Sequence, residues 1–273
     1  MTDLYAVVGN PIAHSQSPLI HQEFARQTRQ KMNYERLLAP LDGFAATVEA
    51  FIQSGGMGMN ITLPFKMEAA QLATQLTARA RAAQAANTLT FKDGEIIGDN
   101  TDGVGLVHDI MENLDVAIKG KRVLLLGAGG AVRGVLLPLL EQRPAQFTLV
   151  NRTVDKAQAL AHAFSVHGEV EAVGYEALLG RQFDIVINGT STSLHNELPP
   201  IPPGIFAARS LAYDMVYASG LTPFLQRAQR ERAAMLADGI GMLAEQAAES
   251  FFIWRGMHVE TRTVMILLRE VLS

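Results

Sequence analysis

An apolar run enters a glycine-rich turn at Lys121-Arg122-Val123-Leu124-Leu125-Leu126-Gly127-Ala128-Gly129-Gly130-Ala131-Val132-Arg133-Gly134. Gly127 permits a tight turn after the predicted strand, while Gly129 and Gly130 carry no side chain where a pyrophosphate approaches the amides of a helix start. A strand, a glycine turn and a helix in this order are typical of a dinucleotide-binding unit, although Val132 stands at the third glycine of the strict fingerprint. A turn that serves only close packing is the alternative.

The sequence on the C-terminal side of this turn repeats the same alternation of strand and crossover. Strands are predicted near residues 122–126, 146–150, 169–173, 183–187 and 210–214. Such a series predicts a parallel, doubly wound sheet with right-handed connections. Two helices, at about 241–255 and 260–272 with Gly256 as the stop between them, follow Gly239 and need a surface to cover.

The N-terminal third reads as a separate α/β unit. Strands are predicted at Tyr5–Val8 and Met57–Leu63, helices at about 18–30, 43–53 and 65–76, and a hairpin within 87–102. Ser17 is expected to be the N-cap of the first helix, with Pro18 at its first position. The change of pattern near Asp102 predicts a first domain of residues 1–102 and a second of 103–238.

Composition bounds the function. The 273 residues suggest just under two domains at about 150 residues each. With 48% apolar residues and 18% charged residues the chain is globular, and a net charge of −4 gives no general attraction to nucleic acid or an anionic membrane. The absence of cysteine excludes disulfides, thiolate metal sites and thiol nucleophiles. No metal site, targeting segment or membrane span is evident, so we expect a cytoplasmic protein.

The residues after the predicted strand at 146–150 favour NADP over NAD. An NAD-binding unit places an acid there to accept from the ribose hydroxyls, whereas this chain has Asn151-Arg152-Thr153 with Lys156 just beyond. A guanidinium binds a 2′-phosphate through charge-assisted hydrogen bonds of about 1.5–3 kcal/mol each. Solvated cations at a helix start are the alternative, but they would oppose the helix dipole.

Polar residues also follow the predicted strands of the first unit. Asn60 and Thr62 share one face of a strand, and Pro64 then places Lys66 near its carboxyl end, where ligands of α/β units bind. Ser15 and Ser17 can hold a small carboxylate together with helix amides. Each has a plainer alternative: Asn60 and Thr62 as edge residues, and Ser17 as a helix cap.

Two further clusters lie later in the chain. Asp102 follows the hairpin in Asn100-Thr101-Asp102-Gly103, where it can be simply the cap of the next helix. Gln246 shares a helical stripe with Leu243 and Ser250, and an inward-facing amide needs polar partners. A polyhydroxylated ligand would provide them.

Taken together, these motifs closely resemble the shikimate dehydrogenase family over essentially the whole chain. The residues that carry the resemblance are His14-Ser15-Gln16-Ser17-Pro18, Asn60-Ile61-Thr62-Leu63-Pro64-Phe65-Lys66, Asn100-Thr101-Asp102-Gly103-Val104-Gly105, Gly127-Ala128-Gly129-Gly130-Ala131, Asn151-Arg152-Thr153 and Gly239-Ile240-Gly241-Met242-Leu243-Ala244-Glu245-Gln246. The resemblance implies a two-lobed α/β fold: an N-terminal substrate domain, a doubly wound Rossmann-like NADP domain, and C-terminal helices that return to the first lobe. Residues 239–273 would then belong with residues 1–102.

The resemblance also implies the site residues and the reaction. Substrate contacts are implied for Ser15, Ser17, Asn60, Thr62, Lys66, Asn87, Asp102, Tyr217 and Gln246. NADP contacts are implied for Gly127, Ala128, Gly129, Gly130, Ala131, Asn151, Arg152, Thr153, Lys156, Thr190, Met215 and Gly239. The implied enzyme is an oxidoreductase acting on a CH–OH group, which reversibly reduces 3-dehydroshikimate to shikimate in aromatic amino-acid biosynthesis.

Lys66 and Asp102 form the implied catalytic pair, and whether Lys66 donates the proton or acts as an electrostatic clamp is open from the sequence. Two alternatives are a quinate/shikimate dehydrogenase with broader substrate or cofactor use, and a non-catalytic NADP-binding regulator. An acid at Asn151 or Arg152 would favour the first, and loss of Lys66 or Asp102 the second. Monomer and homodimer are equally compatible with the sequence.

Overall fold

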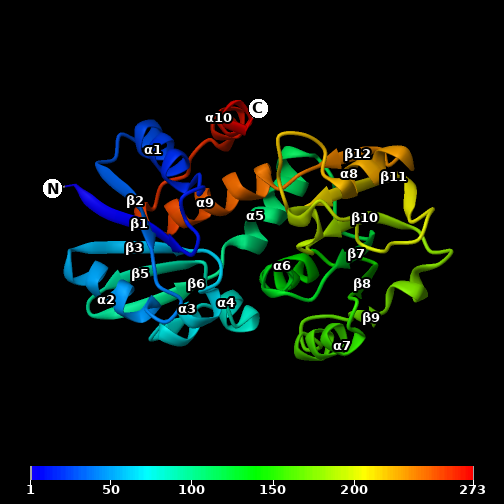
Figure 1. The fold of residues 1–273 in the computed structure, drawn as a ribbon, viewed down its shortest axis with the longest axis horizontal. Coiled ribbons are helices and arrows are strands. Elements are labelled where there is room, and N and C mark those ends of the chain that lie inside the picture. The colour runs from blue at the N-terminus through cyan, green and yellow to red at the C-terminus, as the bar shows by residue number, and fades with distance from the viewer. Residues whose placement is uncertain (1, 273) are drawn as a thin grey trace.

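The computed structural model describes residues 2–272, apart from the side chain of Leu194. Within them the chain forms two six-stranded sheets that lie side by side, with helices α5 (Asp102–His108) and α9 (Ile240–Arg255) between them (Figure 1). The chain crosses between the sheets through these two helices. An α/β fold of two lobes, as predicted, is therefore confirmed.

The first sheet is mixed, with the strand order β2-β1-β3-β5-β6-β4. Its strands are β1 (Asp3–Gly9), β2 (Met32–Leu38), β3 (Gly56–Ile61), β4 (Gln75–Leu76), β5 (Thr88–Lys92) and β6 (Glu95–Asp99). β1 pairs in parallel with β2 and β3, and β5 pairs antiparallel with β3 and β6. The predicted hairpin is the β5–β6 pair.

The second sheet is parallel throughout, with the order β12-β11-β10-β7-β8-β9. Its strands are β7 (Arg122–Leu126), β8 (Gln146–Val150), β9 (Glu171–Val173), β10 (Phe183–Asn188), β11 (Phe206–Asp214) and β12 (Met235–Ala237). Chain order reverses between β7 and β10, which makes the carboxyl end of β7 the switch point of a doubly wound sheet. The glycine-rich turn lies at that point.

Helices cover both sheets. Their bounds are α1 (Ser17–Thr28), α2 (Phe44–Gln53), α3 (Lys66–Leu72), α4 (Ala78–Ala83), α6 (Gly130–Glu141), α7 (Val154–Ala163), α8 (Pro223–Arg230) and α10 (Thr261–Leu272), with a π-helical turn at Asp109–Asn113 and 3₁₀ turns at Tyr175–Leu178 and Thr192–His195. α9 ends at Gly256, whose φ of 64° supplies the predicted left-handed stop. Because α1, α9 and α10 bury apolar residues in one common cluster, the C-terminal helices pack on the first lobe.

Two local predictions are wrong. Ser17 is not the N-cap of α1: Gln16 holds that position without a side-chain cap, and the Ser17 hydroxyl accepts from Ser15 Oγ at 3.2 Å instead. The helix expected to reach residue 76 ends at Leu72, because Ala73 turns to an extended conformation and β4 then pairs with β6. Main-chain pairing with a distant strand overrode the helical spacing.

The departure from the glycine fingerprint is compensated elsewhere in the fold. Val132 is fully buried, and a Cβ placed on Gly189 would lie 2.6 Å from its Cγ2 atom. The small residue that allows helix α6 to approach the sheet thus stands after β10 rather than on the helix. Gly127 keeps its role, with a φ of 107° that favours glycine.

Within residues 2–272, we find no helix that combines the length and the apolar character needed to cross a lipid bilayer.

Candidate active site

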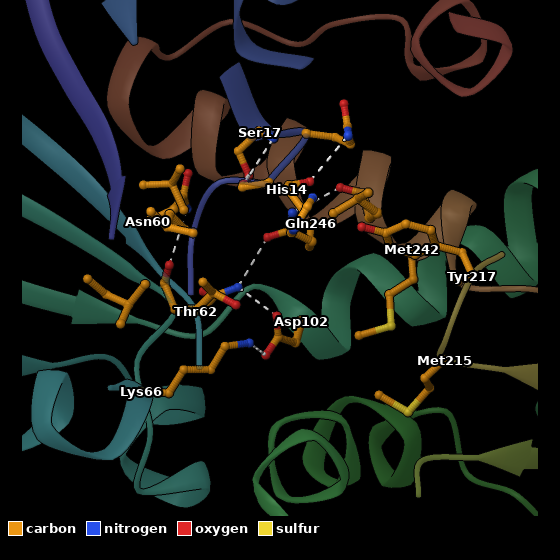
Figure 2. A pocket seen from close by; sticks show the side chains of 18 of the residues that line it. His14, Ser17, Asn60, Thr62, Lys66, Asp102, Met215, Tyr217, Met242 and Gln246 are labelled. Atoms are coloured by element: carbon orange, nitrogen blue, oxygen red, sulfur yellow. Dashed lines mark hydrogen bonds and ion pairs between the residues drawn. The ribbon is translucent and has the colours of Figure 1, made fainter. Parts of the chain in front are cut away.

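A cavity of about 340 Å³ lies between the lobes, where the carboxyl ends of β1 and β3 face α5 and α9 (Figure 2). The structure brings all of the implied substrate residues to this one cavity. They are Ser15, Ser17, Asn60, Thr62, Lys66, Asn87, Asp102, Tyr217 and Gln246. Met215 and Gly239, which carry implied cofactor contacts, line the same cavity from the side of the second sheet. Residues from both lobes therefore line one cavity.

Lys66 and Asp102 meet in this cavity. Lys66 begins α3 just after β3, and Asp102 begins α5 at the other side of the gap. Lys66 Nζ donates to Asp102 Oδ2 at 2.6 Å, with 24% of the lysine side chain and 8% of the aspartate side chain exposed (Figure 2). Asp102 is therefore not a helix cap, since Thr101 holds that position. A charged ammonium is held at the wall of the cavity by a buried carboxylate.

Asn87 fixes the other oxygen of this carboxylate. Its Nδ2 donates to Asp102 Oδ1 at 2.8 Å and to Gln246 Oε1 at 3.2 Å. Its Oδ1 accepts from the backbone N–H of Thr101 at 2.8 Å. The amide thus joins the β5 strand to α5 and α9, and it sets the orientation of the aspartate that holds Lys66.

A buried hydrogen-bond network extends from Asn60 behind the cavity wall, and the sequence pattern did not identify its members Tyr34 and Thr88 as functional. Tyr34 on β2 donates to Asn60 Oδ1 at 2.7 Å, and Asn60 Nδ2 donates to Ser250 Oγ at 3.0 Å and to Thr88 Oγ1 at 3.1 Å. Ser250 in turn donates to the Gln246 carbonyl at 3.0 Å. The periodic stripe of α9 had pointed to Ser250, but no sequence signal pointed to Tyr34.

Hydroxyl groups gather at the opposite end of the cavity. Ser15 Oγ accepts from the backbone N–H of Ser17 at 3.3 Å and donates to Ser17 Oγ at 3.2 Å. Tyr217 lines the cavity nearby, and burial raises the pKa of its phenol, so that it is a neutral donor at physiological pH. Hydroxyls beside the start of α1 form a suitable environment for a small carboxylate.

The glycine-rich turn presents an open helix start. Gly127 N–H donates to the Val150 carbonyl at 2.7 Å, which ties the ends of β7 and β8 together. A Cβ on Gly129 or Gly130 would meet no atom within 4 Å, and no side chain caps α6. The amides of a twelve-residue helix therefore face open space, which fits a pyrophosphate of NADP(H).

The segment after β8 supplies exposed cations next to this turn. The Asn151 side chain closes its own turn by donating to the Thr153 carbonyl at 2.9 Å. Arg152 and Lys156 are exposed, and neither forms an ion pair with another described residue. Burial raises the pKa of Tyr175 to about 12, against the effect of the neighbouring Arg152 charge. The donor set fits a 2′-phosphate.

A third loop connects the two parts of the site. Asn188 Oδ1 accepts from the N–H of Thr190 at 3.1 Å and from its hydroxyl at 2.6 Å. Asn188 Nδ2 donates to Asp214, which also accepts from Ser193 and Thr222. Burial raises the pKa of Asp214 in spite of these donors. This network fixes the loop after β10 between the glycine turn and Met215.

The implied cofactor residues thus fall into two groups. Met215 and Gly239 line the cavity, and their backbones approach so closely that a Cβ on Gly239 would lie 2.2 Å from the Met215 carbonyl oxygen. The others lie outside it, along the carboxyl edge of the second sheet. These are Gly127, Ala128, Gly129, Gly130, Ala131, Asn151, Arg152, Thr153, Lys156 and Thr190.

Comparison with known proteins agrees with this geometry. Residues 7–89 match the model of the shikimate dehydrogenase substrate binding domain, residues 106–196 that of shikimate / quinate 5-dehydrogenase, and residues 239–266 that of the shikimate 5'-dehydrogenase C-terminal domain. A curated relative, shikimate dehydrogenase (NADP(+)) of Chromobacterium violaceum, is 68% identical over 273 residues, covering 100% of both chains.

Two solved structures are also similar. The Ael1 enzyme from Pseudomonas putida has a TM-score of 0.93 at 50% identity, covering 98% of each chain. The shikimate 5-dehydrogenase of Thermus thermophilus in complex with NADP(H) and shikimate has a TM-score of 0.89 at 29% identity, covering 99% of this chain and 100% of that one. From the full-length identity and the three matched models, this chain belongs to the shikimate dehydrogenase family.

Proposed function

We propose that this protein is an NADP-dependent shikimate dehydrogenase, which reversibly reduces the C3 ketone of 3-dehydroshikimate to the alcohol of shikimate. The observation that carries the proposal is the Lys66–Asp102 pair, held at 2.6 Å inside a cavity lined by hydroxyl and amide side chains. The relative of 68% identity carries this activity in its name. The reaction belongs to aromatic amino-acid biosynthesis, and we place the protein in the cytoplasm.

The proposed domain division follows the two lobes. Residues 1–102 and 239–273 form the substrate domain and residues 103–238 the NADP domain. The α1–α9–α10 cluster supports the return of the C-terminal helices, and the parallel order of the second sheet supports the cofactor assignment. The reacting atoms meet between the lobes, since both contribute to the cavity wall.

Lys66 acts on the reacting oxygen. Bound NADP(H) supplies the hydride for reduction and accepts it in the reverse direction. The Lys66 ammonium donates a hydrogen bond to the substrate oxygen, stabilises the negative charge that develops on it and gives it the proton that completes the alcohol; in the oxidation direction Lys66 takes this proton back. Asp102 keeps this ammonium in place, and Asn87 orients Asp102. The rate gain of the protein therefore comes from preorganised charge and position.

The remaining side chains bind the substrate. Asn60, Thr62 and Gln246 face the ring hydroxyls, while Ser15, Ser17 and Tyr217 hold the carboxylate at the far end of the cavity. On the cofactor side, the turn at 127–131 holds the pyrophosphate, and the segment 151–156 with Arg152 and Lys156 holds the 2′-phosphate.

The test is nicotinamide absorbance with the purified protein. We expect NADP to be reduced with shikimate, with little turnover of quinate and little use of NAD. Equal turnover of quinate and shikimate would instead assign a quinate/shikimate dehydrogenase. Tight NADP binding without turnover of either compound would assign a regulator and would overturn the proposal.

A further inference from the structure

The charges that line the cavity cancel one another. Lys66 is the one Lys or Arg side chain and Asp102 the one carboxylate among the described residues that line it, and the two form an ion pair. A substrate that carries a carboxylate, as the proposed function requires, brings one uncompensated negative charge into this space. Hydroxyls and helix amides can bind that group but carry no formal charge, so any further cation that compensates it lies outside the lining.

Arg36 is in the right place for this cation. It lies on β2 opposite Val7 of β1, and Val7 lines the cavity. Paired residues of neighbouring strands project to the same face of the sheet, so the arginine extends along the face that carries the cavity. Its Nε and Nη2 atoms both donate to the Ser15 carbonyl, at 2.9 and 2.6 Å. Ser15 is the residue whose hydroxyl lies at the end of the cavity that is proposed to bind the substrate carboxylate.

The Arg36 charge is uncommitted. Within residues 2–272 none of the ion pairs includes it, and its two short hydrogen bonds go to a neutral carbonyl. By contrast, Arg79, Arg122 and Arg255 of the same protein are each paired with a carboxylate. The two hydrogen bonds from the guanidinium to one carbonyl fix the loop after β1. They leave a full positive charge beside that loop.

We propose that Arg36 is a positioning and charge-compensating residue for the substrate carboxylate. It acts through Ser15: the guanidinium holds the Ser15 backbone so that the Ser15 and Ser17 hydroxyls keep their mutual geometry, and its charge balances the carboxylate that these hydroxyls bind. This inference rests on the proposed function and adds the cation that sets the preference for an acidic substrate.

The test compares shikimate with its methyl ester, which has the same ring but no charge, in wild type, Arg36→Met and Arg36→Lys. For Arg36→Met we expect the KM for shikimate to rise about tenfold, in the upper range for a partly screened charge, with kcat and the KM for NADP changed less than about twofold. The ratio of kcat/KM between wild type and Arg36→Met should be close to one with the ester. Arg36→Lys keeps the charge without the fork and should be intermediate with shikimate.

Arg81→Met is the matched control. Arg36 and Arg81 are both exposed, and Arg81 likewise donates to a backbone carbonyl, that of Leu76 at 3.1 Å, but Leu76 does not line the cavity as Ser15 does. Its KM values should equal those of wild type. If Arg36→Met does not fold, the ionic strength dependence decides: wild-type kcat/KM should fall with added salt for shikimate and stay constant for the ester.

Unchanged KM for shikimate in Arg36→Met, or equal losses on shikimate and the ester, would overturn this role. Equal salt dependence for the two compounds would do the same. Wild-type protein without activity on shikimate would overturn the proposed function itself, and this outcome is seen before any variant is made.

Discussion

Gly105 on α5 lies against the backbone of Gln246 on α9: a Cβ on Gly105 would be 2.6 Å from the Gln246 nitrogen and 2.9 Å from its Cα. Only a residue without a side chain allows the two helices that cross between the lobes to approach this closely. The contact places Gln246 beside Asn87 and Asp102. The close approach of α5 and α9 at Gly105 therefore sets the relative position of Asp102 and Gln246, two proposed substrate contacts.

Gly105→Ala should separate α5 from α9, because the added Cβ would meet the backbone and the Cβ atom of Gln246, which cannot rotate away. We expect a loss of about 1–3 kcal/mol in the free energy of unfolding, the usual cost of overpacking. The KM for shikimate should rise while the KM for NADP changes little. Denaturant unfolding and steady-state kinetics measure both effects. Gly220→Ala, at a position with nothing within 4 Å, should stay within about 0.5 kcal/mol of wild type, and equal losses in the two variants would refute the argument.

His21 is a buried base that folding keeps neutral. Its ring stacks on Tyr34 at 4.2 Å, and neither ring nitrogen has a partner at hydrogen-bonding geometry among the described residues. Burial lowers the pKa of His21 to about 3, against a weak opposing effect of Asn60. The unfolded chain takes up this proton below about pH 6.5, so the stability contribution is complete above that pH and is lost as the pH falls toward 3.

His21→Phe should remove this pH dependence while keeping the aromatic stack. Between pH 7 and pH 5 we expect the free energy of unfolding of the variant to gain about 2 kcal/mol relative to wild type, from the linkage of a single proton. Urea titrations at several pH values give this difference. The exposed His162, replaced in the same way, serves as the control. A constant difference between His21→Phe and wild type across the range would show that folding does not lower the pKa of His21.

Arg152→Ala tests the cofactor assignment. Loss of one or two charge-assisted hydrogen bonds to a 2′-phosphate should raise the KM for NADP about tenfold to a hundredfold. The KM for NAD should stay nearly constant, since NAD lacks that phosphate. Steady-state kinetics with each cofactor measure the ratio, with the exposed Arg209→Ala as control. Equal changes for NADP and NAD would mean that Arg152 does not recognise the phosphate.

Local patterns predicted most of the fold. Five of the six strands of the second sheet follow from apolar runs around a glycine turn, although β11 begins four residues earlier than predicted and β12 was not predicted. β2 was missed because Met32-Asn33-Tyr34-Glu35-Arg36-Leu37-Leu38 belongs to an edge strand whose burial does not follow a clear period. That omission matters for the site, because β2 carries both Tyr34 and Arg36.

The contacts within the site depend on tertiary packing that no local pattern contains. The motifs nominated Lys66 and Asp102 separately, while the 2.6 Å contact between them depends on how α3 and α5 meet. Ser17 was expected to cap a helix, yet its hydroxyl bonds to Ser15. Gly189 takes over the role of the third glycine of the fingerprint, and this is visible only from the approach of α6 to the end of β10. Sequence spacing identifies the chemical groups, and the fold decides which of them touch.

The most direct measurement of the central claim is single-turnover reduction of NADP by shikimate in Lys66→Met and Asp102→Asn, with shikimate affinity measured in parallel by calorimetry. Losing the ammonium, or the carboxylate that holds it, should slow the chemical step about 10²- to 10⁴-fold while shikimate binding weakens far less. Wild-type rates in Lys66→Met would contradict the account, because the reacting oxygen would then be stabilised by some other group.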